Sequence, residues 1–101
     1  MPLTTIAPTS RLAEKVCIVT GSSSGVGQAM AIAFANAGAK LVVCADLRPT
    51  TAKGDGTPTH EMICREFGEG KAVYKKTDAT VGSEVEALVA EAVRLGGRLD
   101  V

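Results

Sequence analysis

The sequence predicts an α/β fold in which helices cover both faces of a parallel sheet, and three observations carry this prediction. Two stretches, 15–20 and 40–45, have apolar residues at consecutive positions after an initial lysine, which is typical of strands that are buried on both faces. The stretch between them has apolar residues three or four positions apart, which is the spacing of one helix face. A third strand-like run followed by a helical stretch occupies residues 71–95. This alternation of strands and helices is the pattern of a parallel α/β sheet.

The first strand, the first helix and the second strand form a βαβ unit, which is right-handed by default. Residues 1–11 show no such pattern, and we expect them to be a flexible leader. The first helix should begin at Ser24 and end at Gly38, which suits a C-terminal cap. The residues expected to face the sheet are Val26, Met30, Ala33, Phe34 and Ala37.

Residues 47–59 contain two prolines, two glycines and four threonines, and this composition predicts a loop. The loop is long for a strand-to-helix connection, and it is either a plain surface insertion or a flap near a bound ligand. A short helix at 60–67 follows, and then a third strand at 71–77 whose lysines suit a sheet edge.

The last helix is predicted at 80–95, where Ser83 and Glu86 have the spacing of a capping box, with Thr80 as an alternative cap. Its expected buried face consists of Val81, Val85, Leu88, Val89, Ala92 and Leu95. Residues 98–101 begin a fourth strand, so we expect the strand order 3-2-1-4 and a doubly wound sheet that is truncated after its third strand–helix unit. One edge of the first strand should then be unpaired and allow self-association.

The composition excludes several classes of partner. Eleven basic residues balance eleven acidic ones, and no run of Lys or Arg forms a basic patch, so we expect neither nucleic acid nor a membrane surface as partner. No apolar stretch approaches the roughly 20 residues of a membrane span. Cys17, Cys44 and Cys64 are odd in number and lack metal-ligand spacing, which predicts buried thiols, no metal site and a cytoplasmic protein.

A glycine-rich turn separates the first strand from the first helix, with glycines at Gly21, Gly25 and Gly27. Glycine permits a sharp turn, close approach of a pyrophosphate to the backbone and close packing of the helix on the sheet. The serines at 22–24 add hydroxyl donors without bulk. Val26 and Gln28 stand where a P-loop would need other residues, so triphosphate chemistry is not expected. The turn therefore predicts a Rossmann-type dinucleotide site.

Two aspartates follow the ends of strands. Asp46 comes directly after the second strand, where a carboxylate can accept hydrogen bonds from the two ribose hydroxyls of an adenosine and would repel a 2′-phosphate. Asp78 follows the third strand and could receive the adenine amino group. The alternatives are a solvated strand-end carboxylate for Asp46 and a helix-entry carboxylate for Asp78.

The segment from Thr20 to Gly27 (TGSSSGVG), Asp46 and the pair Asp78-Ala79 together resemble the first half of a short-chain dehydrogenase/reductase, from about Leu12 to Val101. The resemblance implies an oxidoreductase that transfers hydride to or from an alcohol or ketone. It implies NAD as cofactor, with NADP less favoured because Ser24 occupies the place of a basic residue, although Arg48 could meet a phosphate. The implied cofactor-binding residues are Gly21, Ser23, Ser24, Gly25, Val26, Gly27, Asp46, Asp78 and Ala79. Residues 12–101 would be the N-terminal half of a dinucleotide-binding domain.

Catalytic residues of that family are not found in this sequence. Family members pair a tyrosine with a lysine four residues on, whereas Tyr74, the one tyrosine here, is followed at that spacing by Asp78. We therefore expect this chain to be inactive alone, either as a fragment of an enzyme or as a truncated gene product. The alternatives are a non-catalytic nucleotide-binding chain that needs a partner, and another Rossmann-type protein such as an adenosyl-cofactor methyltransferase.

Overall fold

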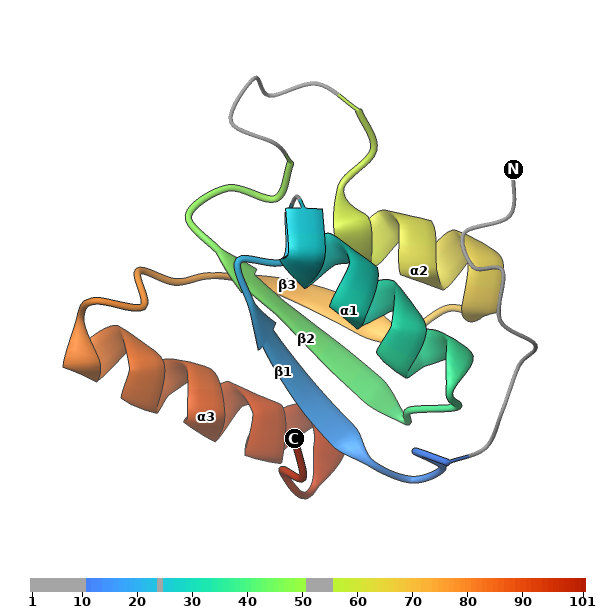
Figure 1. Cartoon of the computed structure of the whole chain (residues 1–101). Coiled ribbons are helices and arrows are strands. Elements are labelled where there is room, and N and C mark those ends of the chain that lie inside the picture. Colours follow the sequence, from blue (N-terminus) through green and yellow to red (C-terminus); the bar gives the residue numbers. More distant parts are fainter. Residues whose placement is uncertain (1–10, 24, 51–55) are drawn as a thin grey trace.

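The computed structural model describes residues 11–23, 25–50 and 56–101. Along the chain its elements are β1 (Val16–Thr20), α1 (Gly25–Asn36), β2 (Leu41–Asp46), α2 (Thr59–Phe67), β3 (Ala72–Lys76) and α3 (Gly82–Gly96). The strands form one parallel sheet in the order β1-β2-β3, with Val16 opposite Leu41 and Val42 opposite Ala72 (Figure 1). The predicted α/β fold and the order of its first three strands are confirmed. The predicted leader and part of the 47–59 loop lie outside the described residues.

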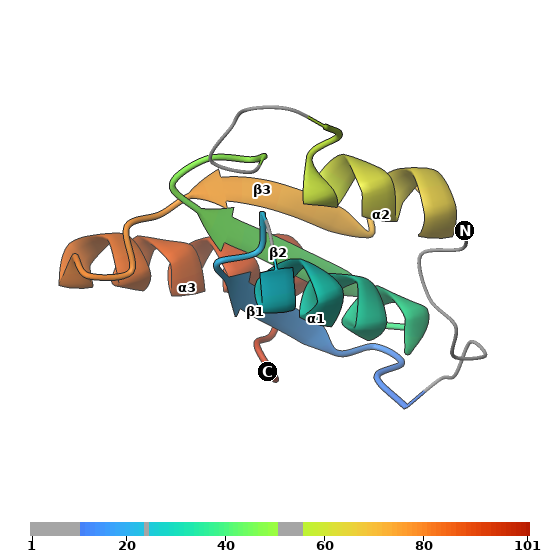
Figure 2. The same cartoon turned by 45° about the horizontal axis from the view of Figure 1, so that its top comes forward.

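Helices cover both faces of the sheet, as Figures 1 and 2 show. One apolar cluster joins α1 and α2 to alternate strand residues such as Cys17 and Cys44. A second cluster joins α3, through Leu88 and Ala92, to the intervening strand residues such as Val43. Successive side chains of a strand point to opposite faces, so β1 and β2 need apolar residues at consecutive positions. This explains the two uninterrupted apolar runs of the sequence.

The predicted buried face of α1 is right only in part, since Phe34 is partly buried and packs against the core. Val26 is 76% exposed and Met30 is 45% exposed, whereas the buried residues of this helix are Ala31, Ile32, Ala35 and Asn36. Small alanine side chains let the helix lie close to the sheet, so the contact face passes through Ala31, Ile32 and Ala35 and not through Val26 and Met30. Spacing alone does not distinguish these two faces, because both repeat every three or four residues.

The predicted buried face of α3 is right in part. Leu88 and Ala92 are buried as expected, but Val81, Val89 and Leu95 are 37 to 42% exposed. The contact continues to Gly96, where a Cβ atom would lie 2.5 Å from Cγ2 of Val16. A glycine therefore brings the end of this helix against β1.

The predicted capping box of α3 is not formed. The residue before the helix is Val81, and no side chain caps it. Glu84 instead accepts a hydrogen bond from the backbone N–H of Asp78 at 3.0 Å. Gly97 ends the helix in the left-handed conformation, with its N–H bonded to the carbonyl of Val93, as the glycine pair predicts.

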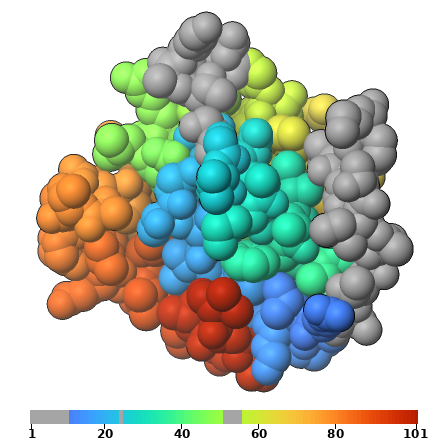
Figure 3. Space-filling view, in the orientation of Figure 1, coloured from blue at the N-terminus to red at the C-terminus, as the bar shows by residue number. Residues whose placement is uncertain are grey.

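Residues 98–101 lie along the edge of β1 that faces away from β2. The N–H groups of Asp100 and Val101 donate to the carbonyl of Val16, and the N–H of Ile18 donates to the carbonyl of Val101. In the space-filling view these C-terminal residues, in red, lie against the blue residues that begin β1 (Figure 3). The prediction that this edge is unpaired is therefore wrong at Val16 and Ile18, and self-association through it stays a prediction.

Candidate functional site

The glycine turn leads from β1 into α1 with two residues in the left-handed region. Gly21 has φ 66° and Gly25 has φ 58°, a conformation that disfavours residues with a side chain. A Cβ atom at either position would meet nothing within 4 Å, so bare backbone faces open space there. Gly27 serves a different purpose, since its Cβ atom would lie 2.6 Å from the carbonyl carbon of Gly21 and closer still to the oxygen. The absence of a side chain at Gly27 thus allows the first turn of α1 to lie on the glycine turn.

The middle of the turn is tied to the neighbouring elements by buried hydrogen bonds. Ser22 is 1% exposed, and its N–H and hydroxyl both donate to the carbonyl of Ala45 at 3.4 Å. Its own carbonyl accepts a hydrogen bond of 2.7 Å from the hydroxyl of Thr59, the first residue of α2. The side chain of Gln28 in turn donates to the Thr59 oxygen at 3.2 Å. The turn is thus held in place by β2, α1 and α2 together.

Asp46, the last residue of β2, receives several hydrogen bonds from this turn. Its Oδ2 atom accepts from the N–H of Ser23 at 3.1 Å and from the Ser23 hydroxyl at 2.5 Å, and its Oδ1 atom accepts from the N–H of Leu47 at 2.7 Å. Partial burial raises the pKa of this carboxyl, but the hydrogen bonds from Ser23, Leu47 and Arg48 outweigh burial and leave the pKa below its ordinary value. Asp46 is therefore ionised at neutral pH.

The end of β3 lies beside Asp46. The N–H of Thr77 and the hydroxyl of Tyr74 both donate to the backbone carbonyl of Asp46, at 2.9 Å each. Asp78 follows, and its Oδ1 atom accepts from the hydroxyl and the N–H of Thr80 at 2.6 and 2.9 Å. These two hydrogen bonds hold the pKa of Asp78 below its ordinary value. Both predicted aspartates are thus charged groups at the carboxyl end of the sheet.

A cleft of about 290 Å³ opens between these strand ends. Figure 1 shows the carboxyl ends of the strands at the upper left of the sheet. Four of the predicted site residues line it, namely Gly21, Asp46, Asp78 and Ala79. Its other lining residues are Thr20, Ala45, Leu47 and Thr77. Thr20 was named only as part of the motif that carries the resemblance, and the other three were not singled out, although each adjoins a predicted residue. In open α/β sheets ligands bind outside the carboxyl ends of the strands, and this cleft lies there.

The other predicted site residues that the structure describes lie in the glycine turn and in the first turn of α1. Ser23 contacts Asp46 directly, and Gly27 packs against the turn from α1. Gly25 and Val26 are exposed at the start of α1, where backbone N–H groups and the helix dipole favour an anion. Ser24 lies outside the described residues. The hydrogen bonds of Thr59 to the turn and of Tyr74 to the end of β2 were not predicted, since neither residue has a sequence signal beyond its residue type.

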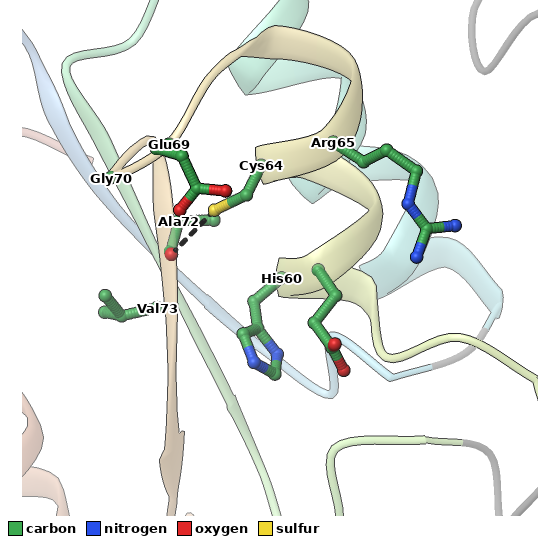
Figure 4. Close-up of a pocket in the computed structure, with 8 residues that line it drawn as sticks. His60, Cys64, Arg65, Glu69, Gly70, Ala72 and Val73 are labelled. Carbon is green, nitrogen blue, oxygen red and sulfur yellow. Dashed lines mark hydrogen bonds between the residues drawn. The ribbon is translucent and has the colours of Figure 1, made fainter.

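A second and larger hollow, of about 560 Å³, lies between α2 and the outer edge of β3 (Figure 4). Cys64 points toward the strand, and its thiol donates to the carbonyl of Ala72 at 3.3 Å. His60 stacks on Tyr74 with their ring centroids 5.8 Å apart. This hollow lies beside Gly70 and Ala72, where β3 begins, and therefore away from the strand ends that the two aspartates follow.

Comparison with known proteins decides the family. A model of the short chain dehydrogenase family matches residues 15–101, which is most of the chain. The chain belongs to this family. The adenosyl-cofactor methyltransferase alternative is therefore wrong, and the resemblance seen in the glycine turn and the two aspartates is confirmed.

Curated proteins resemble the chain over nearly its whole length. It is 37% identical over 90 residues to a short chain dehydrogenase/reductase of Aspergillus oryzae, a match that covers 89% of this chain and 32% of that protein. It is 36% identical over 96 residues to the mitochondrial (−)-isopiperitenol/(−)-carveol dehydrogenase of Mentha piperita. This match covers 95% of this chain and 33% of that protein. The chain thus spans about a third of the length of these curated relatives.

Solved structures also resemble the chain over most of its length. A hydroxysteroid dehydrogenase from Escherichia coli matches with a TM-score of 0.74 and 34% identity, over 89% of this chain and 34% of that one. A short chain dehydrogenase from Mycobacterium smegmatis matches with a TM-score of 0.78 and 27% identity, over 94% of this chain and 38% of that one. The family binds nicotinamide dinucleotide cofactors. Within the described part of the chain, no helix has the length and apolar character needed to cross a membrane.

Proposed function

We propose that this chain is the cofactor-binding portion of an oxidoreductase, and that it binds a nicotinamide dinucleotide across the glycine turn and the cleft at the strand ends. The observation that carries this proposal is the placement of an ionised Asp46 at the cleft, with its carboxylate held by the glycine turn. Residues 12–101 would form half of a dinucleotide-binding domain.

The residues at this site fit the cofactor. Bare backbone at Gly21 and Gly25 leaves room for a pyrophosphate, and the N-terminus of α1 supplies N–H groups. Asp46 would accept hydrogen bonds from the ribose hydroxyls, and Asp78 with Ala79 would border the adenine. A bound nicotinamide dinucleotide supplies hydride transfer to or from an alcohol or ketone.

We infer that the chain prefers NAD over NADP. A 2′-phosphate would face the ionised carboxylate of Asp46, whose hydrogen bonds keep the pKa low and the negative charge in place. Arg48 is exposed two residues further on and is the one basic group of this loop in the described residues that could attract a phosphate. The charge nearest the ribose position therefore favours the cofactor without the phosphate.

We further propose that the chain does not turn over a substrate alone. Tyr74 donates its hydroxyl to the carbonyl of Asp46 and has Asp78, not lysine, four residues later. Its role is therefore to hold the end of β2, and proton transfer to an alcohol or ketone would need residues outside this sequence.

A cytoplasmic location is inferred from the three cysteines, which are free thiols.

The test is calorimetric titration of the 101-residue chain with NADH and with NADPH. We expect NADH to bind more tightly than NADPH. Asp46→Asn should raise the dissociation constant of NADH by about tenfold or more, because hydrogen bonds to a charged group contribute roughly 1.5–3 kcal/mol. Gly25→Val should also weaken both cofactors, because the side chain is disfavoured at φ 58° and would occupy the open space above the turn.

Glu91→Gln is the matched control, since it removes one negative charge from an exposed ion pair with Arg94 on α3. It should leave both dissociation constants unchanged. Undiminished NADH binding by Asp46→Asn and by Gly25→Val would refute the site assignment.

A further inference from the structure

The side chain of Thr59, the first residue of α2, reaches the glycine turn. The capping position before α2 is Pro58, whose side chain has no group that could cap the helix. The Thr59 hydroxyl donates to the carbonyl of Ser22, 37 positions earlier, at 2.7 Å. It also accepts from the side chain of Gln28 on α1. Thr59 is 1% exposed, so water does not replace these bonds.

The carbonyl that Thr59 holds belongs to the same peptide group as the N–H of Ser23. In a planar trans peptide the C=O and N–H point in opposite directions. One end of this group accepts from Thr59, and the other end donates to Oδ2 of Asp46 at 3.1 Å. Rotation of the peptide group would therefore break both hydrogen bonds together.

We propose that Thr59 is a positioning residue for the dinucleotide site, because its hydroxyl fixes the Ser22–Ser23 peptide group that aims the Asp46 carboxylate. The inference rests on the proposed function of Asp46 and adds a role for a residue outside the glycine turn. Thr59 itself does not line the cleft. It acts on the cofactor through Ser23, whose hydroxyl follows the same backbone.

The consequence is that Asp46 is oriented before any cofactor arrives. Thr59→Val keeps the shape of the side chain and removes the donor, which leaves the buried carbonyl of Ser22 either unpaired or turned away. An unpaired buried carbonyl is costly, so the peptide group should rotate and Ser23 should release Oδ2. Thr59→Ser keeps the hydroxyl and should preserve the arrangement.

The first measurement uses the chain without cofactor. We expect Thr59→Val to raise the pKa of Asp46 toward its ordinary value in an NMR titration and to speed hydrogen exchange at the Ser23 amide. Thr59→Ser should resemble the unaltered chain. Ile63→Val is the matched control, because Ile63 is fully buried in the same helix and its apolar side chain belongs to the core cluster, with no group that could hydrogen-bond to the turn. Ile63→Val should lower the unfolding midpoint and leave the pKa of Asp46 unchanged.

The second measurement is NADH affinity at a temperature where all variants are folded. Thr59→Val should raise Kd about fivefold, the factor by which one ordinary hydrogen bond changes an equilibrium, and Ile63→Val should not change it. An unaltered Asp46 titration and Kd in Thr59→Val, or equal changes in Ile63→Val, would overturn the positioning role. Failure of the unaltered chain to bind either cofactor would refute the proposed function instead, while the Asp46 titration would still decide what Thr59 does.

Discussion

Replacement of Gly27 by alanine tests the close packing of α1 on the glycine turn. The added Cβ atom would lie 2.6 Å from the carbonyl carbon of Gly21, closer to its oxygen, and 3.1 Å from the carbonyl oxygen of Thr20. All three atoms belong to the backbone, so no side-chain rotation can relieve the overlap. The helix would have to move away from β1 and from the turn that it supports.

Two opposing effects set the magnitude. Inserting a methyl group into a packed site costs about 1–3 kcal/mol, and backbone neighbours place Gly27 at the upper end of this range. Alanine regains roughly 1 kcal/mol over glycine inside a helix. The net loss in the free energy of unfolding is therefore about 2 kcal/mol, which for a domain of this size lowers Tm by roughly 8–16 °C.

The assay is thermal unfolding followed by circular dichroism, with Gly82→Ala as the matched control. Gly82 begins α3, and a Cβ atom there would meet nothing within 4 Å, so alanine should stabilise the chain by about 0.4–1 kcal/mol. A Gly27→Ala variant that unfolds at or above the Tm of the unaltered chain would show that the close approach is absent. NADH binding should also be lost in Gly27→Ala and retained in Gly82→Ala.

Three further predictions concern Asp46, Tyr74 and α3. The folded-state pKa of Asp46 lies below its unfolded value of about 3.9, so its contribution to stability is present above that pH and is lost as pH falls through the folded pKa. In urea unfolding, the difference in the free energy of unfolding between Asp46→Asn and the unaltered chain should therefore be larger at pH 7 than at pH 3. An equal difference at both pH values would contradict this. Tyr74→Phe should cost about 1 kcal/mol in urea unfolding, because it removes the hydrogen bond to the Asp46 carbonyl; an unchanged midpoint would speak against that bond. Leu88→Ala should cost about 3 kcal/mol, whereas Val89→Ala, at an exposed neighbouring position, should change stability by no more than about 0.5 kcal/mol; similar losses would mean that the face of α3 is misassigned.

The strands and the strand-end acids could be predicted from the sequence because their signals are local. A strand buried on both faces needs apolar residues at every position, and both runs show this. Asp46 and Asp78 were predictable because an acid directly after a buried strand necessarily lies at the carboxyl edge of a parallel sheet. Four of the nine predicted site residues accordingly line the cleft.

The helix faces and the supporting residues could not be predicted in the same way. On α1 the contact passes through Ala31 and Ala35, and small side chains give a weak periodic signal beside Val26 and Met30. Thr59 was unpredictable because its partner Ser22 lies 37 positions away. Such contacts depend on how α2 approaches the glycine turn, which is a property of the whole sheet and not of any short stretch.

The hydrogen bonds between β1 and residues 100–101 bear on the order in which the fold assembles. Val16 and Asp100 are 84 positions apart, whereas the contacts of Ser22 with Ala45 close a segment of 23. Loop-closure entropy grows with the logarithm of segment length, which makes the longer closure costlier by about 1 kcal/mol. The β1–β2 pair should therefore form early in refolding. The hydrogen bonds between the outer edge of β1 and residues 100–101 should form last and should be the first to break.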